Sequence, residues 1–390
     1  MKDASKQSKN EPPVYLDNAA ATPPRPEFLD ALPKLAAETF YNPHATNSLS
    51  EGCMRRIQTA ERRLLRSLGI PENEADVIWT SGGTEANNLA ILGTMSAFGD
   101  GAVAVETAAH SSLLEPVEHL RKIGFDRFPV SVDDAGKLVF DTDEFANFTN
   151  LRLFALCHVN NETGVVQDIC EVRKFLNVNA PSALLLVDAL QSFTKLDIAW
   201  GEGGIDLLSV GGRKLGGPPE IGALVVRRGV PLKPLLFGGG QQRGLRPGTL
   251  NPASILGFSV AVEAALAERE DEWARVEQMN RKLRDRIIAE FEDKSPVVLS
   301  PEDASPYILS IAFPKYEGAI LMRKLSRKGI VIGTGSACSA ESAGTSHVLH
   351  AMGVDARLAR GVLRISFGHA NQETDVDVFL RELRDVMDDY

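Results

Sequence analysis

The chain has 390 residues, of which 44% are hydrophobic and 24% charged, and it is long enough for two domains with a core each. Its formal net charge is −10 and it contains no long basic run, so the composition disfavours a nucleic-acid partner. Residues 1–13 are polar, without the apolar run of a secretory signal, and no stretch approaches the roughly 20 apolar residues that span a bilayer. We therefore expect a cytoplasmic protein with no membrane segment.

Short β-rich runs alternate with helical or loop segments between about residues 76 and 228. The strand candidates are residues 77–80, 102–105, 151–159, 183–189, 207–210 and 221–227. Several are continuously apolar, which is typical of strands buried on both faces of a mainly parallel sheet. The pattern predicts an α/β domain with helices on both faces of the sheet.

The character of the chain changes after Pro252. A set of apolar residues at helical spacing in a charged background predicts a long amphipathic helix: Trp273, Val276, Met279, Leu283, Ile287 and Phe291. Two strand-like runs follow at 308–313 and 362–368, and a final amphipathic helix places Val376, Phe379, Leu380, Leu383 and Met387 on one face. We predict a smaller α+β domain of residues 1–16 and 259–390 beside a large domain of residues 17–258.

The four cysteines, at positions 53, 157, 170 and 338, match no paired metal-binding signature. A chain of this size does not need disulfides. We interpret Cys53, Cys157 and Cys170 as small buried apolar side chains. Cys338 lies in the small polar stretch TGSACSAESAG (334–344), which suits an accessible loop.

The first candidate site is TSGGTEANNLAILG (80–93), directly after a predicted strand. Two glycines and Thr84 at a strand-to-helix turn leave backbone N–H groups free at the positive end of a helix dipole, which suits a phosphate. Neither the dinucleotide fingerprint nor the P-loop ending is present. Taken alone, such a segment is more often a tight turn with Thr84 as the N-cap.

Two further candidates follow along the chain. Asp188 ends an apolar strand, where α/β sheets place ligand-binding groups, and a buried carboxylate needs a cation such as a protonated pyridine nitrogen. Gln191, three residues later, can approach the same ligand. Lys214 follows a predicted strand among glycines, a setting that suits a Schiff-base amine. Taken alone, Asp188 could equally well cap the next helix or turn, and a single lysine is usually a solvated surface charge. The order of a phosphate turn, a strand-end Asp and a glycine-flanked Lys nevertheless indicates a pyridoxal-phosphate site.

A resemblance to a known family runs nearly from end to end. The matching segments are YLDNAAATP (15–23), NPHATNSLSEG (42–52), TSGGTEANNLAI (80–91), HVNNETGVVQDI (158–169), VDALQS (187–192), GGGQQRGLRPGT (238–249), TGSACS (334–339), SHVLHAMG (346–353) and LRISFG (363–368). With them the sequence resembles the cysteine desulfurases, in the class V aminotransferase branch of the fold-type I pyridoxal-phosphate enzymes. The resemblance implies a large cofactor-binding domain with a mainly parallel seven-stranded sheet, and a smaller domain that carries a catalytic cysteine loop.

The resemblance also implies site residues. The catalytic residues would be Lys214, which forms the Schiff base and moves the substrate's Cα proton, His110, which stacks on the ring as an acid or base, and the nucleophile Cys338. The implied cofactor-binding residues are Lys214, Gly83, Thr84, His110, Asp188, Gln191, Arg213 and Thr249.

Substrate contacts and subunit contacts are implied as well. Arg364 would grip the substrate carboxylate through a two-pronged pair, with Asn161 nearby. Thr249 would reach the phosphate of a neighbouring subunit, which implies a homodimer, and no metal is implied. Alone, these residues have ordinary readings: His110 as a helix cap, Arg364 as a surface ion pair and Asn161 as a turn residue.

Three departures from the family pattern bear on the cofactor phosphate and on partners. The family's Ser-x-His-Lys stands here as Gly211-Gly212-Arg213-Lys214, so a hydroxyl and an imidazole that touch the phosphate are replaced, and Arg213 can supply a positive fork instead. Pro247 replaces a common serine. The chain ends at Tyr390 without the longer extension through which housekeeping members dock an iron–sulfur scaffold, which leaves that partner open.

The resemblance predicts that L-cysteine is converted to L-alanine, while its sulfur remains as a persulfide on Cys338 and passes to an acceptor protein. The sequence leaves the acceptor open among an iron–sulfur scaffold, a tRNA-thiolation carrier, a cofactor pathway and DNA phosphorothioation. Selenocysteine lyase and β-eliminating C–S lyase stay open as alternatives, because the same cofactor site serves all three. A catalytically idle paralogue that only binds a partner is disfavoured by the retention of Lys214, Asp188 and Cys338.

Overall fold

The structure is a computed structural model that describes residues 13–140, 150–335 and 346–390. Cys338 lies outside these described residues. Among them, no helix combines the length and the apolar character needed to cross a bilayer.

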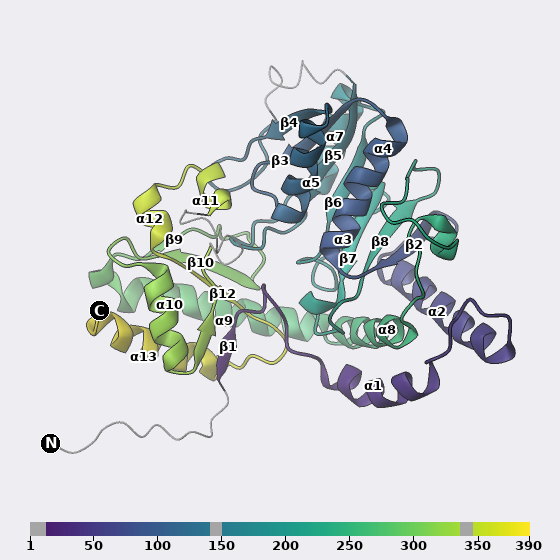
Figure 1. The fold of residues 1–390 in the computed structure, drawn as a ribbon. Helices are drawn as coiled ribbons and strands as arrows, with labels where there is room; N and C mark the ends of the chain where they lie inside the picture. Colours follow the sequence, from purple (N-terminus) through teal and green to yellow (C-terminus); the bar gives the residue numbers. More distant parts are fainter. Residues whose placement is uncertain (1–12, 141–149, 336–345) are drawn as a thin grey trace.

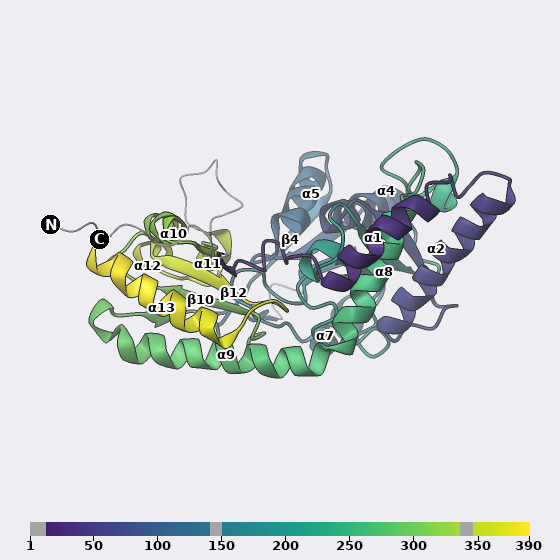
Figure 2. The same ribbon diagram turned by 90° about the horizontal axis from the view of Figure 1, so that it is seen from below.

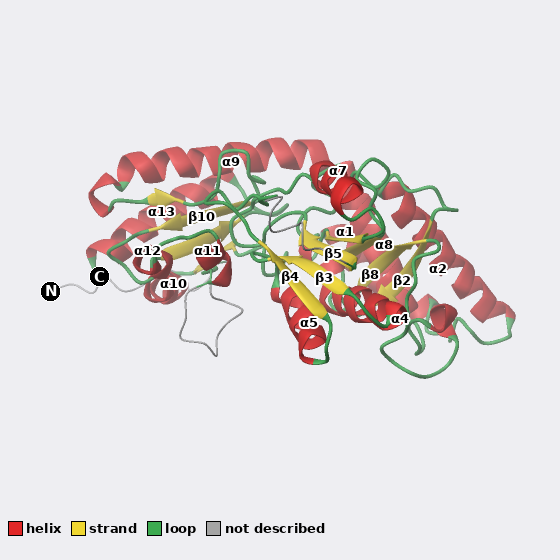
Figure 3. Ribbon diagram, turned by 90° about the horizontal axis from the view of Figure 1, so that it is seen from above, coloured by secondary structure: helices red, strands yellow, loops and turns green. Residues whose placement is uncertain are grey.

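The larger part of the molecule is built around a seven-stranded sheet (Figures 1 and 3). Its strands lie in the order β2 (Ala75–Thr80), β8 (Gly222–Arg227), β7 (Leu207–Gly211), β6 (Leu184–Asp188), β5 (Leu151–Cys157), β3 (Ala102–Glu106) and β4 (Asp126–Val130). Strand β8 is antiparallel to both of its neighbours, and the other pairs are parallel. The predicted mainly parallel α/β sheet is therefore confirmed.

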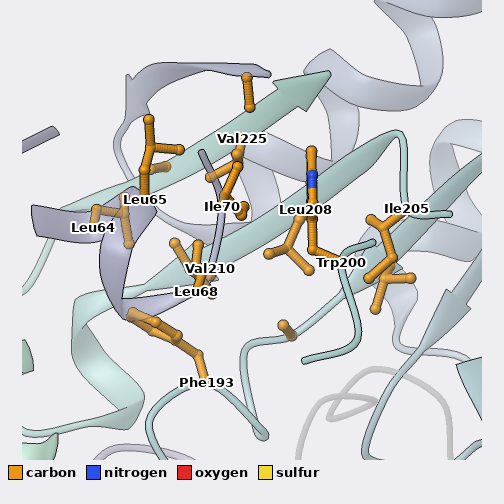
Figure 4. Close-up of a cluster of buried hydrophobic side chains, with 14 of the residues drawn as sticks. Leu64, Leu65, Leu68, Ile70, Phe193, Trp200, Ile205, Leu208, Val210 and Val225 are labelled. Atoms are coloured by element: carbon orange, nitrogen blue, oxygen red, sulfur yellow. The ribbon is translucent and has the colours of Figure 1, made fainter. Parts of the chain in front are cut away.

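Helices cover both faces of this sheet, and the strand residues alternate between the two cores. One face packs against α1 (Pro26–Glu38), α2 (Ser48–Ser67), α7 (Ile169–Asn179) and α8 (Pro252–Ala267), and the other against α3 (Gly83–Asn88), α4 (Thr94–Phe98) and α5 (Ser111–Lys122). Along β5, Phe154 faces the first core and Leu153 the second. Figure 4 shows part of the first core, where Leu64 and Leu65 of α2 lie near Val210 and Val225 of the sheet.

The smaller part has its own core around a three-stranded antiparallel sheet. The strands lie in the order β12 (Val362–Ser366), β10 (Ile308–Ala312) and β9 (Val297–Val298), while β1 (Val14–Leu16) pairs in parallel with β11 (Ile330–Ile332). Its helices are α9 (Arg269–Glu290), α10 (Gly318–Arg327), α11 (His347–Ala351), α12 (Ala356–Arg360) and α13 (Glu373–Asp388). Figure 2 shows α9 extending from α8 along the smaller part beside α13.

The two predicted amphipathic helices are confirmed as α9 and α13. Val276, Met279, Leu283 and Ile287 on α9 are fully buried, as is Phe379 on α13. The predicted boundary after residue 258 falls inside α8, whose later residues still pack on the core of the larger part. The domain limits stay a prediction.

Candidate active site

Lys214 lies at the end of a single 3₁₀ turn, Gly212–Lys214, directly after β7. Its Nζ donates hydrogen bonds to the backbone oxygens of Ala19 at 2.7 Å and Ala20 at 2.6 Å. The Ala19 oxygen also accepts from Nε2 of Gln191 at 2.9 Å. The connection between β1 and α1 therefore brings the lysine and the glutamine together at the carboxyl ends of β6 and β7.

Asp188 is the last residue of β6 and is only 6% exposed. Its Oδ1 accepts from the backbone N–H of Leu190 at 2.9 Å, and its Oδ2 accepts from Nδ2 of Asn87 at 2.7 Å. Burial raises the pKa of Asp188, and the nearby His110 and Lys214 oppose that rise. This carboxylate is thus held in place by neutral donors and lies in an environment that favours a cationic ligand.

His110 caps the N-terminus of α5 and lies in the same group. Its Nδ1 accepts from the backbone N–H of Ser112 at 3.1 Å, so the proton of the neutral ring resides on Nε2. Burial lowers the pKa of His110, which favours that neutral form. The Ser112 hydroxyl lies 2.8 Å from Nδ1 and accepts from Asn87 Nδ2 at 2.8 Å. A continuous hydrogen-bonded path therefore joins Asp188, Asn87, Ser112 and His110.

The predicted phosphate turn lies where β2 ends and α3 begins. Thr84 is exposed, and the first residues of α3 have backbone N–H groups without partners inside the helix. A side chain at Gly83 would displace Leu190, because a Cβ there would lie 2.1 Å from a Leu190 methyl carbon. The turn thus packs directly against the residues that follow Asp188.

The loop that carries Thr249 is tied to this turn by a two-pronged ion pair. Arg246 contacts Glu85 through Nε at 2.8 Å and through Nη2 at 3.3 Å. Thr249 itself is exposed. Arg213 is exposed as well, and its side chain has no hydrogen bond or ion pair with any described residue. The structure therefore leaves both side chains accessible to a ligand or to a second chain.

Arg364 lies on β12 of the smaller part and faces the larger part. It is 4% exposed, its Nη2 contacts Asp17 Oδ1 at 2.7 Å, and its Nη1 donates to the backbone oxygen of Asn161 at 3.0 Å. Its Nε is buried and has no partner among the described residues. The reading of Arg364 as a surface ion pair is therefore wrong, because its guanidinium lies buried where the two parts of the molecule meet.

Sequence reasoning missed Asn87, Ser112 and Asp17. Asp17 and Asn87 lie inside segments that carry the family resemblance, and no pattern within the short polar helix α3 distinguishes the buried Asn87 from its neighbours. No group of three or more metal-binding side chains occurs in the described part of the chain.

Comparisons with known proteins agree with this architecture. The sequence profile of the family described as "Aminotransferase class-V" matches residues 14–379, and the chain belongs to that family. Within it, the chain groups with the cysteine desulfurases. It is 33% identical over 380 residues to "Cysteine desulfurase IscS" of Dictyoglomus turgidum, covering 96% of this chain and 94% of the relative.

Two solved structures extend the comparison to the fold. A "NifS-like protein" superposes with a TM-score of 0.87 at 29% identity, over 97% of this chain and 100% of that chain. A structure titled "SspA in complex with cysteine" has a TM-score of 0.78 at 32% identity, over 90% of this chain and 98% of that chain. The fold is that of the fold-type I α/β enzymes.

Proposed function

We propose that this chain is a pyridoxal-phosphate-dependent cysteine desulfurase, which converts L-cysteine to L-alanine and holds the sulfur as a persulfide on Cys338. The observation that best supports the proposal is the convergence of Lys214, Asp188, Gln191 and His110 at one end of the sheet, beside the buried Arg364. Relatives named as cysteine desulfurases over nearly the whole chain support it as well.

The residues present fit pyridoxal phosphate. Asp188 is a buried carboxylate that forms no ion pair with any described residue. It is therefore available to pair with a protonated pyridine nitrogen. Gln191 Oε1 is buried without a partner among the described residues, and its amide lies beside Lys214. Gly83, Thr84 and Arg213 would hold the phosphate, together with Thr249 of a second copy. When bound, the cofactor supplies an electron sink for negative charge at the substrate's Cα.

The chain's own residues divide the remaining work. Lys214 would attach the cofactor and then take the Cα proton on its Nζ. His110 would lie against the ring with its proton on Nε2, and Asn87 would hold both His110, through Ser112, and Asp188 in place. The buried N–H group of Arg364 Nε would be available to a substrate carboxylate, with Asn161 beside it.

The sulfur step would use the Cys338 thiolate as its nucleophile. A bond forms between the Cys338 sulfur and the substrate's Sγ while the bond between Sγ and Cβ breaks. The electron pair of the broken bond remains with the substrate carbon skeleton, which takes up a proton at Cβ and leaves as alanine. The step is balanced: L-cysteine and a thiol give L-alanine and a persulfide, with no added oxidant or reductant.

A homodimer, a sulfur-acceptor protein and a cytoplasmic location complete the proposal. Large apolar side chains are exposed in two segments that include helix α1 and the start of the Thr249 loop: Leu29, Leu32, Phe40, Leu49, Leu236 and Phe237. Exposed apolar groups of this kind support a protein interface, and a second copy of the chain would cover them. The acceptor would be a protein of the iron–sulfur scaffold or tRNA-thiolation type.

The direct experiment is to incubate the purified protein, reconstituted with pyridoxal phosphate, with L-cysteine and to analyse the products. We expect equal amounts of alanine and transferable sulfur, together with a visible absorption band that Lys214→Ala abolishes. Pyruvate in place of alanine would instead identify a C–S lyase. A Lys214→Ala variant that retained full turnover would contradict the assignment of the site.

A further inference from the structure

Glu162 is a buried carboxyl group that the proposed chemistry does not use. It is 7% exposed and lies in the loop that follows β5. Asn160 fixes this loop, because its Oδ1 accepts from the backbone N–H groups of Glu162 at 2.9 Å and Thr163 at 3.1 Å, while its Nδ2 donates to Ala108 O at 2.9 Å. Glu162 is therefore presented from a hydrogen-bonded turn of the larger part.

The carboxylate of Glu162 hydrogen-bonds to one of the two described residues that flank the segment 336–345 and lies beside the other. Its Oε2 accepts a hydrogen bond from the hydroxyl of Ser346, which is 3% exposed. On the other side, a Cβ placed on Gly335 would lie 2.9 Å from the same Oε2 and 3.3 Å from Ser346 Cβ. The two residues on either side of the segment 336–345, Gly335 and Ser346, therefore both lie beside Oε2 of Glu162.

The hydrogen bond from Ser346 to Glu162 has a defined direction. The Ser346 hydroxyl accepts from the backbone N–H groups of Val348 at 3.1 Å and Leu349 at 3.3 Å, because Ser346 is the N-cap of α11. These two donors occupy the lone pairs, so the single hydroxyl hydrogen is directed to Glu162. The helix start, the serine and the carboxyl group form one connected unit.

The residues on both sides of the segment 336–345 are hydrogen-bonded to, or beside, side chains of the candidate site. Asn161, the neighbour of Glu162, gives its backbone oxygen to Arg364, and Gly333 exchanges two backbone hydrogen bonds with Arg364 at 2.9 and 3.0 Å. On the return side, His347 Nε2 donates to the backbone oxygen of Ala109, next to His110, at 2.8 Å. Both flanks are therefore anchored beside residues that the proposed function uses.

We propose that Glu162 is a positioning residue for the sulfur-transfer step: it binds Ser346 and lies beside Gly335, and so fixes where the segment that contains Cys338 is attached relative to Arg364. This inference rests on the proposed function of Cys338. Cys338 stands three residues after Gly335, and three residues of extended chain span at most about 11 Å. The location of Gly335 therefore limits how far the thiol can lie from the substrate.

The chemistry of Glu162 suggests a conservative replacement for the test. Burial raises the pKa of Glu162 to about 7, against the opposing effects of Ser346 and Arg364. Glutamine has nearly the same size and shape as glutamate, and its carbonyl oxygen can accept the Ser346 hydroxyl in the same way. Alanine removes the acceptor entirely.

The test compares Glu162→Ala and Glu162→Gln in the cofactor-loaded protein, with Glu382→Ala as the matched control. Glu382 is equally buried, at 4% exposure, but lies on α13, where it pairs with Lys328. For Glu162→Ala we expect kcat for alanine and for persulfide on Cys338 to fall about 100-fold, the scale of a small misplacement, with KM for L-cysteine within about threefold. Glu162→Gln and Glu382→Ala should remain within about threefold of the parent.

Two further measurements make the test decisive. Ser346→Ala should slow the same step, and the double variant should lose no more than Glu162→Ala alone, because the two residues act as one unit. Amide hydrogen exchange at residues 348–349 should accelerate at least about tenfold in Glu162→Ala and not in Glu382→Ala. The inference would be overturned if the parent forms alanine and Glu162→Ala keeps the parental kcat, whether or not its KM for L-cysteine rises. A parent that forms no alanine would contradict the proposed function instead. In that case the exchange measurement still tests the positioning role, and unchanged exchange at residues 348–349 in Glu162→Ala would overturn it.

Discussion

At the scale of single residues, the candidate site depends on side chains that the sequence indicated and on others that only the fold reveals. Asp188, Gln191 and Lys214 follow strand ends, so their proximity could be expected from an α/β sheet. Asn87 could not be assigned in this way, because it acts through hydrogen bonds to Ser112 and to Asp188, which is 101 residues away in the sequence. The roles of all these residues stay predictions.

Arg213 offers a test of the proposed phosphate contacts. It stands where the family's histidine stands, it is exposed, and no described residue pairs with it. Arg213→Ala should weaken cofactor binding about tenfold or more, because a charge-assisted hydrogen bond is lost. Gly211→Ser combined with Arg213→His should recover much of that affinity. Equilibrium titration with pyridoxal phosphate measures both, and equal affinity for Arg213→Ala and the parent would show that Arg213 points elsewhere.

Glu106 gives a prediction for pH-dependent stability. It is fully buried at the end of β3, and burial raises its pKa from 4.5 to about 7, although Cys157 N and Gln167 Nε2 donate to it. Since the folded protein keeps a proton that the unfolded chain releases, the resulting stability is fully present below about pH 4.5 and is lost as the pH rises through about 7.

Glu106→Gln should lack this decline. Between pH 5 and 8, the parent should therefore lose on the order of 2 kcal/mol more unfolding free energy than the variant does. Urea unfolding of both proteins at the two pH values measures the difference. Parallel pH dependences for parent and variant would mean that Glu106 is already ionised in the folded protein.

At the scale of elements, the buried strands and the two long amphipathic helices could be predicted because their apolar patterns are strong. Strand β4 was missed because it is a partly exposed edge strand that contains Pro129, a residue that edge strands tolerate. Strands β1 and β11 were missed because each has three residues, and they form through pairing between distant segments. Such elements depend on tertiary contacts that no local pattern encodes.

Arg25 joins elements of both parts and gives a prediction at this scale. It is 3% exposed and contacts Glu272 at 2.6 Å, Glu268 at 2.7 Å and the backbone oxygen of Leu215, next to Lys214, at 3.1 Å. Arg25→Met should reduce the unfolding free energy by about 3–5 kcal/mol, because the carboxylate of Glu272 is left buried without its partner.

The matched control for Arg25 is an exposed pair of the same type. Arg63 contacts Glu263 at 2.6 Å, and both side chains are 52% exposed. Arg63→Met should therefore cost at most about 1 kcal/mol. Urea unfolding compares the two variants with the parent, and similar losses would show that the cluster around Arg25 is no more important than a surface ion pair.

At the scale of the whole molecule, the candidate site lies where the two parts meet. The larger part contributes Lys214, Asp188 and His110, and the smaller part contributes Arg364. The resemblance in the sequence indicated this division of labour, but the packing of Arg364 between Asp17 and Asn161 appears only in three dimensions. Assembly of two copies, in which Thr249 reaches the site of the neighbouring subunit, stays a proposal. Measurement of the molecular mass in solution would test it.

The measurement that tests the central claim most directly is intact-mass and peptide analysis after mixing the cofactor-loaded protein with L-cysteine, without reductant. The parent should gain the mass of one sulfur atom on the peptide that contains Cys338, and should form alanine. Cys338→Ser should still change its absorption spectrum with L-cysteine but form no persulfide and almost no alanine, because a hydroxyl group is a poor nucleophile toward sulfur. Desulfuration by Cys338→Ser at the parental rate, with no sulfur on the parent's Cys338 peptide, would contradict the account.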